Sequence, residues 1–269
     1  MARNYKTTRR SGEIQTEYDG HILHGWWRID DSLAGRKLDA YFNNFCIAVD
    51  LSNDCDVEEL AARLFSQLVE ENYISIDRID SRLPLPIREA AHKLVNGLDI
   101  TPNANCDYDP FYGIVRAFGD QPIGSITHKR VSCLCLNALK IILPAWLSCC
   151  DNPSVAQVHE SLTQYMYNDV EPENWDRMFE PVIATRDGVE IKDCIICMVG
   201  PIASGIVLAA KYIRTGNLLD ASNAVLHAWE ATDEGAWRRE NMTFQQWLVF
   251  IALPASYECR QLDEDEFRN

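Results

Sequence analysis

Positive charge is scarce in this sequence. Lysine and arginine together number 25 against 40 aspartates and glutamates, so the formal net charge at pH 7 is −15. Such a chain repels a phosphate backbone unless its few cations cluster tightly, and we therefore expect no nucleic-acid partner. Hydrophobic residues make up 47% of the 269 residues, a composition that excludes wholesale disorder and suits one large or two smaller folded domains.

Long apolar runs are also lacking. The longest uncharged run extends from Cys194 to Ala210, short of the roughly 20 residues of a membrane span, and it contains Pro201. We expect a buried helix that is broken near Pro201, and no membrane partner. The first residues carry cations with no apolar segment behind them, so we expect no secretory signal. These features together predict a cytoplasmic protein.

Several catalytic motifs are absent or incomplete. The sequence has neither a G-x-G-x-x-G fingerprint nor a G-x-S-x-G nucleophile elbow. Gly200 and Gly205 have the glycine spacing of a phosphate-binding loop, but the lysine that should follow is missing, so we expect them at a helix–helix contact. His159 and Glu160 begin an H-E-x-x-H pattern in which Thr163 stands in place of the second histidine. We therefore predict no catalytic residue from these motifs.

Cysteines and histidines are the candidate ligands for a metal ion such as zinc. The ten cysteines include Cys194 and Cys197, which have zinc-ligand spacing, but the residues between them are bulky and apolar. Most of the cysteines lie in apolar runs, where a reduced thiol behaves as a small core residue. His21 and His24 are interpreted as a structural pair. We predict no metal site and no cofactor.

Apolar residues recur with helical spacing through most of the chain. A stripe at i, i+3, i+4 and i+7 spans 57–69, and similar patterns cover 87–95, 128–150 (with Pro144 placed to kink it), 155–166, 194–214, 219–231 and 243–258. Strands are expected only at about 10–50, where Asp19-Gly20 is a hairpin signal, and at 182–192. The predicted fold class is mainly α, an irregular bundle or stack of helical hairpins with a small N-terminal β element.

One hairpin has a specific resemblance. The segment around Gly216, Ala221 and Ala228 resembles the turn of a single tetratricopeptide-type hairpin, in which small residues let two helices approach closely. No second copy follows at the period of that repeat. The resemblance therefore implies an αα-hairpin and no membership of a repeat family.

The same patterns suggest a division of the chain. We expect residues 1–12 to form a flexible tail and residues 13–52 a small mixed or β element packed on the rest. Residues 53–262 are predicted to form a helical domain, and residues 263–269 an acidic tail.

An acidic segment is the candidate binding site. It surrounds two aromatic residues with carboxylates, and its predicted partner-binding residues are Asp169, Glu171, Glu173, Trp175, Asp176, Phe179 and Glu180. Aromatic anchors ringed by charge of one sign suit the capture of a basic partner. The competing interpretation is a short amphipathic helix whose two aromatic residues face the core.

These observations favour a non-catalytic, acidic, helical protein-binding module. Within that class we expect a stoichiometric inhibitor or immunity-type protein that neutralises a basic enzyme such as a toxin or nuclease. One alternative is an all-α, metal-dependent enzyme that uses paired aspartates, namely Asp30/Asp31, Asp54/Asp56, Asp77/Asp80 and Asp107/Asp109. A second alternative is a scaffold of stacked hairpins that docks peptides.

Overall fold

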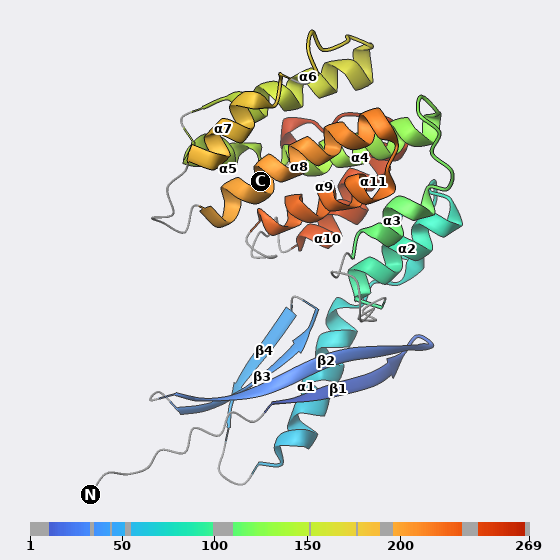
Figure 1. Cartoon of the computed structure of the whole chain (residues 1–269). Coiled ribbons are helices and arrows are strands. Elements are labelled where there is room, and N and C mark those ends of the chain that lie inside the picture. The colour runs from blue at the N-terminus through green and yellow to red at the C-terminus, as the bar shows by residue number, and fades with distance from the viewer. Residues whose placement is uncertain are drawn as a thin grey trace, which may run out of the picture. The chain divides into compact units, whose positions relative to one another are not determined.

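The computed structural model confirms a mainly α fold with a small N-terminal sheet (Figure 1). The structure describes residues 11–32, 35–43, 45–51, 55–98, 110–150, 152–175, 177–188, 196–232 and 242–266. The described residues fall into two compact units, one within Met1–Ser75 and Asn96–Ile100, the other within Ile76–Val95 and Thr101–Asn269.

The first unit is built on an antiparallel meander. Its strands follow each other in chain order: β1 (Ser11–Tyr18), β2 (His21–Ser32), β3 (Gly35–Phe42) and β4 (Phe45–Asp50). Asp19 and Gly20 both have positive φ, 50° and 76°, and Tyr18 pairs with His21 across the turn. This is the two-residue hairpin expected from an Asp-Gly pair.

One face of the sheet is covered by α1 (Val57–Asn72). Alternate strand residues point to opposite faces, and those on the α1 side are buried, among them Leu23, Ile29, Leu38 and Phe42. The predicted apolar stripe of α1 meets them with Ala61, Leu64, Phe65, Leu68 and Val69. The expected boundary at residue 52 separates the sheet from this helix, whereas the structure places α1 in the core of the sheet, where Leu64 and Phe65 pack with the inner strand residues.

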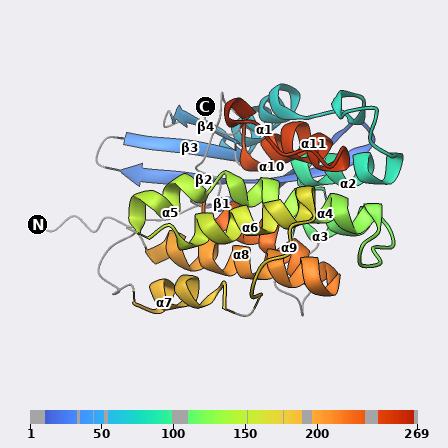
Figure 2. The ribbon, with the colours of Figure 1, turned by 90° about the horizontal axis from the view of Figure 1, so that it is seen from above.

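The second unit consists of helices packed around α4. Its helices are α2 (Leu85–Asn96), α3 (Tyr112–Ala117), α4 (Ile126–Lys140), α5 (Leu143–Cys149), α6 (Ser154–Asn168), α7 (Glu180–Gly188), α8 (Ile196–Thr215), α9 (Leu218–Glu230), α10 (Phe244–Trp247) and α11 (Leu253–Tyr257). A π-helical turn, Leu248–Ala252, joins the last two, and 3₁₀ turns lie at Ile76–Arg78 and Glu264–Glu266. Helices α6, α8, α9 and α11 all contact α4 (Figure 2).

The predicted αα-hairpin is formed by α8 and α9. Gly216 has a φ of 68° in the connection, and Ala221 and Ala228 are fully buried. A Cβ at Gly205 would come within 2.7 Å of Leu139 Cδ2 on α4 and 3.5 Å of the Ala224 carbonyl oxygen on α9. Gly205 therefore lies at a helix–helix contact, as expected, whereas a Cβ at Gly200 would meet no atom within 4 Å, so the same expectation does not hold for Gly200.

Three sequence expectations need correction. Residues 182–188 belong to α7 and not to a strand, since Pro181 stands in the first helical turn and Thr185 donates to its carbonyl oxygen. The predicted helix at 128–150 is divided in two, because α4 ends at Lys140 and Pro144 stands in the first turn of α5. In contrast, α8 continues through Pro201, where burial of Ile202 and its neighbours outweighs one missing hydrogen bond.

None of the helices in the described part of the chain has the length and apolar character needed to cross a bilayer.

Candidate functional site

The acidic segment begins where α6 ends. Asp169 follows the helix in the left-handed conformation (φ 54°), and its N–H donates to the carbonyl oxygens of Gln164 and Tyr165. This cap turns the chain away from the helix axis. A turn around Asn174 then leads to α7, with the Arg177 N–H 3.1 Å from Asn174 Oδ1.

Trp175 holds this segment against two helices. The ring of Tyr165 on α6 meets it edge to face at a centroid distance of 5.2 Å, and the Arg214 guanidinium on α8 lies 5.7 Å from its ring centroid. Its Nε1 donates to Glu171 Oε1 at 2.6 Å. Trp175 is half-buried, so it is neither a fully exposed anchor nor a core residue.

The carboxylates of the segment face solvent. Asp169, Glu171, Glu173 and Glu180 are exposed, as is the neighbouring Val170 with 55% of its surface accessible. Among the residues that the structure describes, Asp169, Glu173 and Glu180 make no ion pair. Phe179 is half-buried, and Asp176 lies outside the described residues. The structure thus brings most of the predicted residues onto one exposed, acidic loop.

The paired aspartates of the alternative enzyme hypothesis have structural partners. Asp56 caps α1 by accepting from the N–H groups of Glu58 and Glu59 at 3.1 and 3.2 Å. Asp80 forms an ion pair with Arg82 at 2.6 Å, which holds the pKa of that carboxyl below its usual range. The described residues contain no group of three potential metal ligands. Asp54, Asp107 and Asp109 lie outside the described part of the chain, and so does the side chain of Asp31.

Histidine and cysteine side chains take structural positions. His159 is buried, with Nε2 2.9 Å from the Leu136 carbonyl oxygen, and burial lowers its pKa. His21 and His24 stand three residues apart on β2, so they point to opposite faces of the sheet. The cysteines with described side chains are free thiols, namely Cys46, Cys55, Cys133, Cys135, Cys150 and Cys259. Cys194 and the side chain of Cys197 lie outside the described residues.

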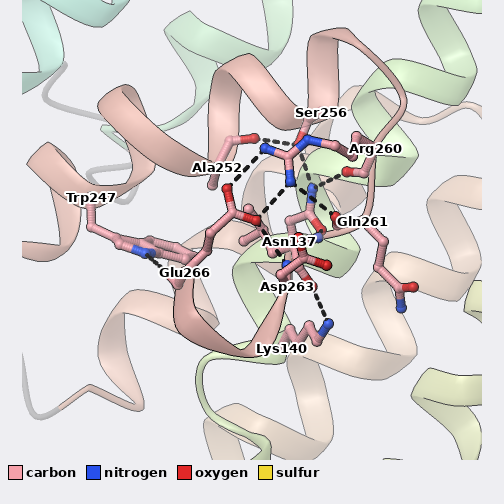
Figure 3. A network of polar contacts seen from close by, with 10 residues as sticks. Asn137, Lys140, Trp247, Ala252, Ser256, Arg260, Gln261, Asp263 and Glu266 are labelled. Carbon is pink, nitrogen blue, oxygen red and sulfur yellow. Dashed lines mark hydrogen bonds and ion pairs between the residues drawn. The ribbon is translucent and has the colours of Figure 1, made fainter. Parts of the chain in front are cut away.

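A polar network fastens the C-terminal segment to α4 (Figure 3). The Arg260 guanidinium donates to both carboxylate oxygens of Glu266 at 2.7 and 2.9 Å, and Trp247 Nε1 donates to the Glu266 carbonyl oxygen. Asn137 donates to Ser256 and to the Arg260 carbonyl oxygen. The expected acidic tail is therefore held in place at 263–266, because the Glu266 carboxylate accepts from Arg260 and from the Asp263 N–H.

Sequence reasoning missed a cluster on the open face of the sheet. Trp26 on β2 stacks on Tyr41 of β3 with a centroid distance of 3.9 Å and an interplanar angle of 4°. Arg28 Nε donates to Asp39 Oδ2 at 2.9 Å, and the Tyr41 hydroxyl lies 3.2 Å from the same oxygen. Burial raises the pKa of Tyr41 to about 12, so its hydroxyl keeps the proton that it donates. The alternation of Ile22, His24, Trp26 and Arg28 was the available sequence signal.

Comparison of the chain with protein-family models, curated proteins and solved structures finds no match, so its function is inferred from its own geometry.

Proposed function

We propose that this protein is a non-catalytic, acidic binding module whose segment 169–180 contacts a basic protein partner. The proposal extends to a stoichiometric inhibitor or immunity-type protein that neutralises a basic enzyme in the cytoplasm. The observation that supports this proposal is the set of exposed carboxylates in this segment. They belong to Asp169, Glu171, Glu173 and Glu180, and the fold covers none of them.

Exposed charges act mainly on the rate at which two proteins associate and less on their final affinity. The carboxylates of segment 169–180 outnumber its one cation, Arg177, and leave a local negative potential, which attracts a positively charged surface and raises the association rate constant. The net charge of −15 adds a long-range field of the same sign. This field is screened over about 8 Å at physiological ionic strength, so the effect depends on salt.

Trp175 contributes in a different way. Its contacts with Tyr165 and Arg214 limit the conformations of the loop before a partner arrives. A loop that is ordered in advance loses less conformational entropy on binding. In this proposal Trp175 positions the carboxylates, and only its exposed part reaches the partner.

The experiment compares two variants with equal changes in charge. The site variant carries Asp169→Asn, Glu171→Gln, Glu173→Gln and Glu180→Gln. Asparagine tolerates the left-handed conformation at 169, and glutamine at 171 still accepts from Trp175. The control variant changes four exposed acids of α1 to glutamine, namely Glu58, Glu59, Glu70 and Glu71.

Partners are first captured from cells of the native host, identified and purified, and association is then measured at several salt concentrations. The site variant should slow association at least about threefold more than the control and reduce its salt dependence, while dissociation changes little. Equal slowing by both variants would assign the effect to overall charge and remove segment 169–180 from the contact. Capture of acidic partners alone would contradict the proposal.

A further inference from the structure

The open face of the first unit carries an aromatic side chain with one uncovered ring face. Trp26 has 44% of its surface exposed although Tyr41 stacks directly on it. Tyr41 belongs to β3, so it covers the indole on the β3 side of β2. The uncovered indole face is therefore directed towards β1, the other neighbour of β2.

A carboxylate stands beside that uncovered face. Glu13 on β1 is the register partner of Trp26, and directly opposed residues of an antiparallel pair have Cβ atoms about 5 Å apart. Glu13 is exposed and makes no ion pair with any residue in the described ranges. An aromatic face and a carboxylate thus flank one position above the sheet.

The Trp26–Tyr41 stack is held in place on its Tyr41 side. Arg28 lies 5.5 Å from the Tyr41 centroid and 6.0 Å from that of Trp26, and its charge is paired with Asp39. Asp39 is only 8% exposed and accepts from the Tyr41 hydroxyl, which holds the Tyr41 ring in place, while half of the Arg28 side chain remains exposed. The aromatic pair is therefore ordered before any ligand binds.

The charge of this face selects the ligand. Lys37 lies in register with Asp30 and Asp50, and Arg28 is paired with Asp39. Glu13 and Glu17 then remain on the β1 side with no cation opposite them, since their register partners are Trp26 and Ile22. A nucleic acid would place phosphates beside these carboxylates, and a second copy would bring an identical acidic face.

We propose that this face binds an arginine side chain presented by a basic protein segment. The guanidinium plane stacks on the uncovered face of Trp26, and its N–H groups donate to the Glu13 carboxylate. Guanidinium suits both contacts because it is planar, weakly hydrated and always charged. This surface belongs to the first unit, and the inference does not depend on segment 169–180 of the second.

The test follows the indole N–H signals of the full-length, ¹⁵N-labelled protein by NMR. The probe is the peptide acetyl-Gly-Arg-Gly-Arg-Gly-amide, and its lysine counterpart is the control ligand. Trp26→Phe identifies the Trp26 signal by its loss. The arginine peptide should shift that signal saturably, and the lysine peptide should bind about threefold more weakly because ammonium stacks less well than guanidinium.

Matched variants test the carboxylate. Glu13→Gln should weaken the arginine peptide about threefold, as expected for a single exposed ion pair. Glu17→Gln removes the same charge from the same strand, opposite Ile22, and should change the affinity less than Glu13→Gln does. Unchanged chemical shifts elsewhere in each variant verify that the sheet is intact.

Four results would overturn this inference. They are a Trp26 signal that does not move, equal binding of the two peptides, equal effects of Glu13→Gln and Glu17→Gln, and a stronger shift with a single-stranded oligonucleotide or with increasing protein concentration alone. The four-acid variant of segment 169–180 should leave the titration unchanged. A negative titration would therefore contradict only the arginine site on the sheet, and unchanged partner kinetics would contradict only the binding role of segment 169–180.

Discussion

The two units bury their apolar residues in different ways. The sheet of the first unit is covered by α1 on one face, so alternate residues of β1, β2 and β4 stay exposed. Helix α4 of the second unit is surrounded by other helices, and Val131 to Leu139 are buried without interruption. The first arrangement leaves a broad face of side chains for binding, whereas the second requires internal partners for every polar group that it encloses.

Buried asparagines show the same requirement in both units. In the first, Asn96 exchanges two hydrogen bonds with the backbone of Ile74 at 2.8 and 3.0 Å. In the second, Asn137 bonds to Ser256, Arg260 and Leu262. Each side chain bonds to backbone groups of an irregular segment, and Asn137 joins three residues, Ser256, Arg260 and Leu262.

The largest expected effect is therefore on the second unit. Asn137→Ala should lower the free energy of unfolding by roughly 3 kcal/mol, because the Arg260 carbonyl and the Leu262 N–H lose their buried partner. Urea denaturation measures the loss, and hydrogen exchange at 258–266 locates it. Gln67→Ala, which removes an exposed hydrogen bond to Glu71, is the control and should cost less than about 0.5 kcal/mol. Similar losses for both variants would contradict the importance of the network.

The next effect concerns close packing in the first unit. A Cβ at Gly25 would lie 2.2 Å from Phe65 Cε2 and 2.4 Å from the Tyr41 carbonyl oxygen. Gly25→Ala should therefore destabilise the protein by about 2 kcal/mol through displacement of α1 or β3. Gly113→Ala in α3 meets no atom within 4 Å and should be neutral or stabilising by up to about 1 kcal/mol. Thermal unfolding of the pair measures the contrast, and a tolerated Gly25→Ala would show that the sheet and α1 are not so closely packed.

A smaller effect should appear in acid, through the second unit. Burial lowers the pKa of His128 and of His159, so below about pH 6.5 the unfolded chain takes up protons that the folded chain does not. Stability should therefore be full above that pH and fall as the pH decreases towards the folded pKa values, by at most about 1.4 kcal/mol per pH unit for each histidine. Denaturation from pH 7.5 to 5 measures the slope.

Direct titration of the histidine ring signals by NMR provides an independent check that needs no substitution. Two histidines with pKa values below the ordinary value are expected. Ordinary values for both His128 and His159 would contradict their burial.

The smallest effect is expected at the acidic segment. Glu173→Gln with Glu180→Gln should change the free energy of unfolding by less than about 0.5 kcal/mol, because both side chains are exposed and make no ion pair within the described residues. Chemical denaturation provides the measurement. A loss of more than about 1 kcal/mol would indicate a structural role for these carboxylates and weaken the proposed binding role.

The sequence located the acidic segment but not the position of its tryptophan. Exposure of Asp169, Glu173 and Glu180 follows from charge, because an unpaired carboxylate is costly to bury. Whether Trp175 faces solvent or the core depends on Tyr165 and Arg214, and Arg214 is far away in the sequence. The Trp26–Tyr41 stack was likewise missed, because it depends on the register between two strands.

By itself the sequence determined the elements whose pattern is local. The apolar stripe of α1 and the Asp19-Gly20 hairpin depend on neighbours within a few residues, since backbone geometry sets the periods of 3.6 and 2. Tertiary structure alone decided the anchoring of the C-terminal segment by Trp247 and Asn137 and the membership of α1 in the sheet core. These features depend on contacts between residues far apart in the chain. The free energy of such contacts offsets the entropy cost of closing the loops between them, and the contacts leave no periodic signal in the sequence.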